Sequence, residues 1–407
     1  MTNIRRSILK RLVKAQTPLL TETYLSQAIL RTLRYERAEA GTFGAHAAGT
    51  LPPVFPASYN EVAKPKALYE DKLMLRAPLP VVQPIILKNT RLDPYSGAMH
   101  KKNVALVWQK ELDQKHRFKR EFGRSSLIKA NNVVYFKSPA ESYLTRGLCA
   151  VAPGATNWYH WLIEILPTIM LLQNLPKDYD HYPLLVPQEV LSGGTFREAL
   201  DLFAGRRSVI GLDRDKNYRV GEMVIIPPPV SGPFNMHDHL WPEPEDYINN
   251  IGVMQQFRTQ TLERLAVTDN EHSPKRLFFA RAPGTRSYNQ NDIVEVARAR
   301  GFVIMRPEKL SFREQVQMMY NADFVAGPSG AAWANSIFMR PGTKSLIWSL
   351  KEYDGACFFS NLGHVAGCQT TYCFVDADVT IRNSYEAFSA SYVLTPKEFS
   401  DHLDALL

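Results

Sequence analysis

Short apolar runs alternate with amphipathic segments through the second half of the chain. Runs of this length, bounded by turn residues, are typical of buried strands, and apolar positions three and four apart are typical of helices. The predicted strands are residues 277–280, 303–305, 324–326 and 345–348, and the predicted helices between them are 292–300, 312–320 and 331–339. This alternation predicts a parallel sheet with crossover helices, whose ligands bind at the carboxyl ends of the strands.

The first half has a less regular pattern. Apolar runs predict strands at 81–87, 105–108, 133–136, 184–186 and 223–226, and helical spacing predicts helices at 157–174 and 245–265. Thr156 is the expected N-cap of the first helix. Residues 38–60 are rich in glycine, alanine and proline and are predicted to form a linker.

Composition excludes several classes of protein. The 407 residues are 45% hydrophobic and 22% charged, which is ordinary for a globular protein and excludes a disordered chain or a coiled-coil rod. Four cysteines without a Cys-x-x-Cys pair predict a reducing compartment. The longest apolar stretches fall short of the roughly 20 residues that a membrane span needs, so we expect a cytoplasmic protein.

The positive charge is concentrated at the N-terminus. Of a net charge of +8, residues 1–40 carry eight basic and three acidic side chains. A nucleic-acid-binding protein usually spreads basic residues over a folded face, so no nucleic-acid partner is expected. Residues 1–15 have apolar positions at helical spacing opposite the basic ones. Such a helix either contacts an anionic membrane surface, peripheral to the inner membrane, or docks on its own domain.

Two loops of the second half have residues suited to a diphosphate. Arg281, Arg286 and Asn289 follow the first strand, and two guanidinium groups can neutralise a diphosphate through paired N–H donors. Ser329, Gly330 and Ala331 join a later strand to a helix, where unpaired backbone N–H groups attract phosphate. The same sequence pattern would result if the arginines only faced solvent and the turn had small residues only because it is tightly packed. Glu308, also on a strand-end loop, has a carboxylate suited to ribose hydroxyls.

A third motif lies in the predicted helix 157–174. Asn157, His160 and Glu164 share one helix face because they are three and four residues apart. Near a helix N-terminus the helix dipole favours a neutral imidazole, which suits a general base, and Glu164 orients the ring or accepts the proton itself. A buried His–Glu pair with no catalytic role has the same spacing.

The segment His237-Asp238-His239 has two possible functions. Alternate residues of a strand face one side, so the two histidines are candidate metal ligands, but no third and fourth ligands cluster nearby. We therefore predict no metal site, and keep these residues as candidates for acceptor contacts.

In order along the chain, these motifs resemble glycosyltransferase family 61, in particular its bacterial members in capsular polysaccharide biosynthesis. The pieces are Asn-x-x-His-x-x-x-Glu-x-x-Pro from Asn157, the Arg281–Arg286 pair, the segment from Pro307 to Gln315, and the turn that leads to Asn335. The resemblance covers about residues 150–350. Many members have a histidine where this chain has Ser329, so that histidine's role does not transfer. Gln315 and Asn335 are expected to brace the loops.

The resemblance implies an α/β fold of GT-B type, with two facing Rossmann-like domains, to which the sequence pattern adds an N-terminal helical segment. We expect the boundaries 1–60 for the basic helical segment and linker, 61–265 for the acceptor-side domain, 266–380 for the nucleotide-sugar-binding domain and 381–407 for a helical tail. It further implies an inverting mechanism, a donor that is expected to be UDP-linked, an oligo- or polysaccharide acceptor and no essential metal or cofactor.

The leading hypothesis is therefore an inverting glycosyltransferase with His160 and Glu164 as the catalytic pair. The sequence leaves open whether the sugar is a hexose, an N-acetylhexosamine or a pentose. The alternative is a non-catalytic nucleotide- or carbohydrate-binding subunit of a membrane-associated polysaccharide assembly, favoured by Ser329 in place of the family histidine and by the basic N-terminus.

Overall fold

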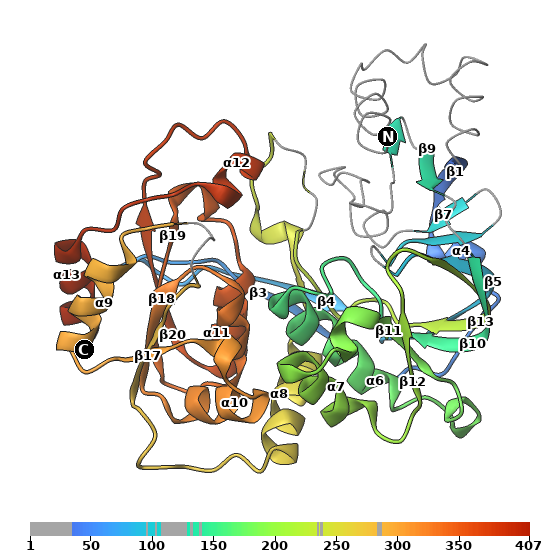
Figure 1. Ribbon diagram of the computed structural model, residues 1–407, viewed down its shortest axis with the longest axis horizontal. Helices are drawn as coiled ribbons and strands as arrows, with labels where there is room; N and C mark the ends of the chain where they lie inside the picture. The colour runs from blue at the N-terminus through green and yellow to red at the C-terminus, as the bar shows by residue number, and fades with distance from the viewer. Residues whose placement is uncertain are drawn as a thin grey trace.

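The chain forms two α/β lobes that lie side by side (Figure 1). The structure is a computed structural model that describes residues 35–94, 97–101, 104–106, 128–130, 133–137, 141–233, 236, 239–282 and 287–407. The basic segment 1–15 lies outside the described residues. Within the described residues, no helix is both long and apolar enough to cross a membrane.

The C-terminal lobe is built on a parallel sheet. Five strands in this described part pair in the order β17-β16-β18-β19-β20. Their bounds are Val303–Met305, Arg276–Phe279, Phe324–Pro328, Lys344–Leu350 and Gln369–Val375. Because the first two strands along the chain are reversed in this order, the sheet has a topological switch point between β16 and β18, where doubly wound folds bind ligands. All four strands predicted here are confirmed.

Helices cover both faces of this sheet (Figure 1). One face is covered by α9 (Gln290–Ala299) and α13 (Pro396–Leu406), and the other by α10 (Phe312–Asn321), the 3₁₀ helix η7 (Ala331–Phe338) and α11 (Phe358–Ala366). Residues 381–407, predicted as a helical tail, are instead part of the lobe. Phe399 and Leu403 of α13 are buried against it, and the ammonium of Lys344 donates to the carbonyl of Leu406 at 2.6 Å.

The N-terminal lobe has a mixed sheet in place of the predicted Rossmann-like one. Its parallel part is β12 (Val209–Leu212), β11 (Leu184–Pro187), β10 (Glu141–Cys149) and β13 (Asn217–Ile225). Next to β13 the sheet continues antiparallel through β5 (Ile85–Leu92) and β6 (Met99–Lys101). A short connection joins β5 to β6 and suits antiparallel pairing, whereas β5 and β13 pair although they are far apart in the sequence.

Beyond β6 the sheet continues through strands whose pairing was not predicted from the sequence. β7 (Val104–Leu106), β1 (Tyr35–Gly41), β9 (Val133–Lys137) and β8 (Ile128–Ala130) follow in that order, and β2 (Gly49–Thr50) pairs with β5. The linker predicted at 38–60 is therefore wrong, because β1 ends within it, α4 (Phe43–His46) and β2 lie within it, and β3 begins there. Phe43, fully buried, anchors this segment to the sheet.

The two lobes share a hydrophobic core. The apolar faces of α6 (Leu166–Leu172), α7 (Gly194–Ala204) and α8 (Ile251–Arg264) pack in one cluster with those of α10, η7 and α11. A hairpin of β3 (Ser58–Ala63) and β4 (Met74–Leu79) also crosses to the C-terminal lobe. There Ala63 N–H donates to Asn361 Oδ1 at 2.8 Å, and Tyr372 N–H donates to the Lys66 carbonyl at 2.8 Å.

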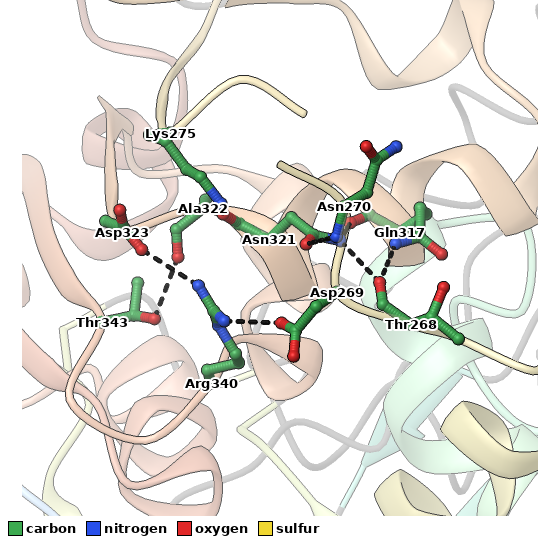
Figure 2. A network of polar contacts seen from close by, with 10 residues as sticks. All are labelled: Thr268, Asp269, Asn270, Lys275, Gln317, Asn321, Ala322, Asp323, Arg340 and Thr343. Carbon is green, nitrogen blue, oxygen red and sulfur yellow. Dashed lines mark hydrogen bonds and ion pairs between the residues drawn. The ribbon is translucent and has the colours of Figure 1, made fainter. Parts of the chain in front are cut away.

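A polar network braces the amino-terminal edge of the C-terminal sheet (Figure 2). Asn321, fully buried, accepts from the Asn270 N–H at 2.7 Å and donates to the Thr268 carbonyl at 3.1 Å. Arg340 bridges Asp269 at 2.7 Å and Asp323 at 3.1 Å. The segment that follows α8 is thus fixed at the edge opposite the strand-end loops, which leaves the carboxyl edge for ligands.

Candidate functional site

The helix that carries His160 begins with an unusual turn. Asn157 Oδ1 accepts from the Tyr159 N–H at 2.9 Å, so Asn157, and not the predicted Thr156, caps the helix start. Residues His160–Ile165 then form a π-helical turn, η2, before α6 continues. Such wide turns are rare and frequently occur at functional sites.

His160 and Glu164 form a hydrogen-bonded pair on this turn. Nδ1 of His160 lies 2.7 Å from Oε2 of Glu164, and the other carboxylate oxygen accepts from the Gly232 N–H at 2.9 Å. Each side chain is 12% exposed. Because Nδ1 faces a carboxylate and donates to it, the neutral ring has its lone pair on Nε2, where a general base needs it.

Two opposing effects act on the pKa of His160. Burial alone would lower this pKa, but the negative charge of Glu164 and its hydrogen bond raise it above the ordinary value. The shift in the pKa of His160 is thus opposite to the one expected from the helix dipole alone, and its cause is the adjacent carboxylate. The carboxylate makes the imidazole a stronger base.

Gly154 packs directly behind the imidazole. A Cβ atom built on Gly154 would lie 2.6 Å from His160 Cδ2, and its φ of +76° is a conformation that other residues adopt at a cost. The side of the ring that faces Gly154 is therefore closed by backbone. This contact had no signal in the sequence beyond the glycine itself.

At the switch point of the C-terminal sheet, the structure brings two predicted donor loops together. The Arg281 guanidinium, which follows β16, donates through Nη2 to the Ser329 carbonyl, which follows β18. Gly330 precedes η7 in extended conformation, and a Cβ there would find only the Pro328 carbonyl, at 3.8 Å. Ala331 is the first residue of η7. Arg286 lies outside the described residues.

The backbone of Arg281 is held by a residue that the sequence did not single out. Gln290 accepts from the Arg281 N–H at 2.7 Å and donates to its carbonyl at 3.1 Å. The amide thus fixes the loop after β16 in the way a neighbouring strand would. The sequence signal for this role is the position of Gln290 at the start of α9, nine residues after Arg281.

The remaining predicted donor and supporting residues lie in other segments of the C-terminal lobe. The amide of Asn289 donates to the Leu394 carbonyl at 2.9 Å and accepts from the Leu394 N–H at 3.1 Å, so it fixes the C-terminal segment, and its donor contact stays a prediction. Glu308 is exposed in η6 (Pro307–Lys309), the loop after β17. Gln315 and Asn335 are both buried and hydrogen-bond to each other at 2.9 Å.

The predicted acceptor segment is only partly described. His237 and Asp238 lie outside the described residues, and His239 lies in an exposed turn. In the part of the chain that is described, no group of three or more histidine, cysteine, aspartate or glutamate side chains could hold a metal ion.

A cavity of about 70 Å³ lies beside Glu164. Its walls come from the carboxyl ends of β10 and β13 and from the start of α6. Most lining side chains are apolar, among them Val151 and Ile226, and the polar ones include Glu164, Thr168 and Ser231. The N-terminal lobe thus has a largely apolar hollow with a carboxylate in its wall.

Contacts between the lobes place His160 near the strand-end loops of the C-terminal sheet. Tyr159, next in the chain, packs edge-on against Phe358 and Phe359 at ring distances of 5.2 and 5.9 Å. Trp158 donates to Asn335 Oδ1, in η7, at 3.3 Å. The helix start that carries the imidazole therefore contacts the elements that follow β18 and β19.

The fold is that of an α/β protein with a topological switch point in the C-terminal sheet and a histidine–carboxylate pair on a helix of the N-terminal lobe. Residues 158–346 match the family model described as Glycosyltransferase 61. This range contains His160, Glu164, Arg281 and Gly330, and the match supports a glycosyltransferase enzyme. No curated protein matches the chain at a significant level.

Proposed function

We propose that the chain is an inverting glycosyltransferase that transfers a sugar from a nucleotide-sugar donor to a hydroxyl of a glycan acceptor. The observation that carries the proposal is the hydrogen-bonded pair of His160 and Glu164. His160 lies two residues after Trp158, which contacts the donor-side helix η7. Inverting transfer needs a base at the acceptor and positive groups at the leaving diphosphate.

In the proposed reaction, Nε2 of His160 takes the proton of the acceptor hydroxyl. The hydroxyl oxygen forms a bond to the anomeric carbon while the bond from that carbon to the diphosphate oxygen breaks, so the configuration inverts. Glu164 stabilises the imidazolium that forms, through the 2.7 Å contact with Nδ1. The proton then passes to solvent and the nucleoside diphosphate leaves.

The leaving diphosphate is assigned to the turn at the switch point. At the start of η7, next to Gly330 and Ala331, the first backbone N–H groups have no partner within the helix and are directed along its axis toward the turn, where partial positive charge attracts anions. Arg281 adds a formal charge at the same turn, and Arg286 and Glu308 remain candidates for phosphate and ribose contacts. Ser329 contributes through its backbone carbonyl, which holds the Arg281 guanidinium at the turn and does not need the family histidine.

The proposal also assigns one substrate to each lobe. The C-terminal lobe takes the donor, expected to be UDP-linked, and the N-terminal lobe takes the acceptor near the cavity beside Glu164, which is a GT-B division. No metal or cofactor is assigned to the reaction. We place the enzyme in the cytoplasm, peripheral to the inner membrane through residues 1–15, in bacterial capsular or cell-surface polysaccharide biosynthesis.

A ligand screen followed by product analysis tests this function. A thermal-shift panel of nucleoside diphosphates and nucleotide sugars should yield one nucleotide that stabilises the protein, since a ligand at 100 times its Kd contributes about 2.7 kcal/mol. That donor, incubated with oligosaccharide acceptors, should give a product whose new linkage has the opposite anomeric configuration by NMR. A retained configuration contradicts inversion, and neither binding nor transfer contradicts the function.

A further inference from the structure

A chain of buried hydrogen bonds runs from the His160 helix into the C-terminal lobe. The indole N–H of Trp158 donates to Asn335 Oδ1 at 3.3 Å, and Asn335 Nδ2 donates to Gln315 Oε1 at 2.9 Å. Gln315 Nε2 in turn donates to the Pro307 carbonyl at 2.8 Å. The chain thus joins the helix start, η7, α10 and the loop after β17.

The direction of this chain is fixed by its members. Asn335 Nδ2 also donates to the Ala332 carbonyl at 3.2 Å, and Gln315 Nε2 also donates to the Leu310 carbonyl at 3.2 Å. Rotating either amide would set donor against donor, because an indole N–H has no acceptor capacity. Asn335 and Gln315 are 0% and 2% exposed, so water cannot replace a lost partner without a structural change.

The indole is also held in place by aromatic contacts. Phe196 of α7 meets it edge-on at 5.2 Å, and Phe312 of α10 meets it edge-on at 5.8 Å. One ring is from the N-terminal lobe and the other from the C-terminal lobe. Trp158 is therefore a fixed point between the lobes, two residues before His160.

We propose that Trp158 is a positioning residue that sets the distance between the imidazole of His160 and the donor turn before η7. The inference rests on the proposed function, because it assumes that the donor binds at that turn. A change of about 1 Å in such a distance can cost roughly 100-fold in rate. Loss of this hydrogen bond should therefore lower the transfer rate, in addition to the stability cost of leaving the buried Asn335 oxygen without its partner.

The same helix offers a matched control. Trp161 is fully buried, and its indole N–H donates to the Phe196 carbonyl at 3.2 Å, entirely within the N-terminal lobe. Trp158→Phe and Trp161→Phe each remove one indole N–H and keep an aromatic ring. Only the first removes a contact to η7.

The experiment compares the full-length wild type with both variants. Trp158→Phe should lower kcat by roughly 10- to 100-fold while the Kd for the nucleoside diphosphate stays within about twofold. Trp161→Phe should lower the melting temperature and keep kcat near the wild-type value. A purely structural role predicts equal losses of stability and unchanged kcat in both folded variants, and that result would overturn the inference.

A spectroscopic measurement reads the same contact without catalysis. In protein with ¹⁵N-labelled indoles, the Trp158 resonance is the one that disappears from the spectrum of Trp158→Phe. Added nucleoside diphosphate should shift this resonance and leave the Trp161 resonance nearly unchanged. Binding without that shift would contradict the positioning role while the proposed function stands. Absence of both nucleotide binding and transfer in the wild type would overturn the proposed function together with the inference.

Discussion

Nδ1 of His160 lies 2.7 Å from Oε2 of Glu164, and the second oxygen of that carboxylate accepts the Gly232 N–H at 2.9 Å. The carboxylate is thus held from both sides, by an imidazole on its own turn and by a backbone group 68 residues away in the sequence. This arrangement fixes the ring orientation and leaves the lone pair of the neutral ring on Nε2, the atom to which we assign the proposed base role.

Removing the charge of Glu164 should change the pH dependence of transfer. The carboxylate raises the pKa of His160, so the neutral, active ring is lost as the pH falls through that raised value. In Glu164→Gln the pKa falls, and the acidic limb of kcat/KM moves to lower pH. The plateau rate also falls, by roughly 100-fold or more, because an amide cannot accept from both of its partners.

The pH profile of kcat/KM for wild type and Glu164→Gln is the measurement. His160→Asn, which has no titrating ring, should show no acidic limb from this group. An acidic limb at the same pH in wild type and Glu164→Gln would mean that another group titrates.

We expect Gly154→Ala to impair transfer because Gly154 packs directly against the imidazole ring of His160. A Cβ at Gly154 would come within 2.6 Å of His160 Cδ2, and the φ of +76° adds about 1–2 kcal/mol of backbone strain for alanine. We expect kcat to fall well beyond what the loss of folded protein explains, as the ring is displaced. Enzyme kinetics with parallel thermal melts measure both effects.

Gly342→Ala is the matched control for that variant. Gly342 also has a positive φ, +84°, but a Cβ there would meet nothing within 4 Å. It should carry the backbone strain alone and keep kcat. Similar kcat values for both variants would argue against the close packing on His160.

Arg281→Lys should weaken donor binding. Lysine keeps the charge but lacks the paired N–H groups with which Arg281 contacts the Ser329 carbonyl and is expected to meet phosphate. Losing a charge-assisted hydrogen bond of about 1.5–3 kcal/mol raises the donor Kd by roughly 10- to 100-fold. Calorimetric titration with the nucleoside diphosphate measures this change.

The control for Arg281 lies on the same strand. Arg276 begins β16 at the opposite sheet edge, where its guanidinium donates to the Arg300 carbonyl at 2.6 Å. Arg276→Lys should leave the donor Kd unchanged. If both variants weaken binding equally, the effect is not specific to the carboxyl edge.

Asn321→Ala should destabilise the protein without affecting the site. Its buried amide satisfies the Asn270 N–H and the Thr268 and Gln317 carbonyls at the edge opposite the donor turn (Figure 2). Their loss should lower the free energy of unfolding by about 1–3 kcal/mol, measured by urea denaturation. Donor affinity at low temperature should not change, and a stability equal to wild type would contradict the bracing role.

The C-terminal lobe was the more predictable one because its signals are local. Each predicted strand and helix lies close in sequence to its partner, and α10 begins with the capping box of Ser311 and Glu314 that marks a helix start. The final helix α13 was assigned to a tail because its burial depends on Phe399 and Leu403 meeting a distant sheet.

The N-terminal sheet was less predictable because its order depends on distant pairings. Ile85 pairs with Ile225 across 140 residues, and nothing local specifies that contact. The contacts of the predicted site residues also differ in whether the sequence could reveal them. The spacing of His160 and Glu164 was visible in the sequence, but the contact of Asn289 with Leu394, 105 residues away, was not.

The most direct test of the central claim is single-turnover transfer by His160→Asn, measured together with its donor affinity. We predict that the variant binds the nucleotide-sugar donor as tightly as the wild type and releases nucleoside diphosphate at least about 100-fold more slowly at the pH optimum. A wild-type rate of release from the variant, at equal donor occupancy, would contradict the assignment of His160 as the base.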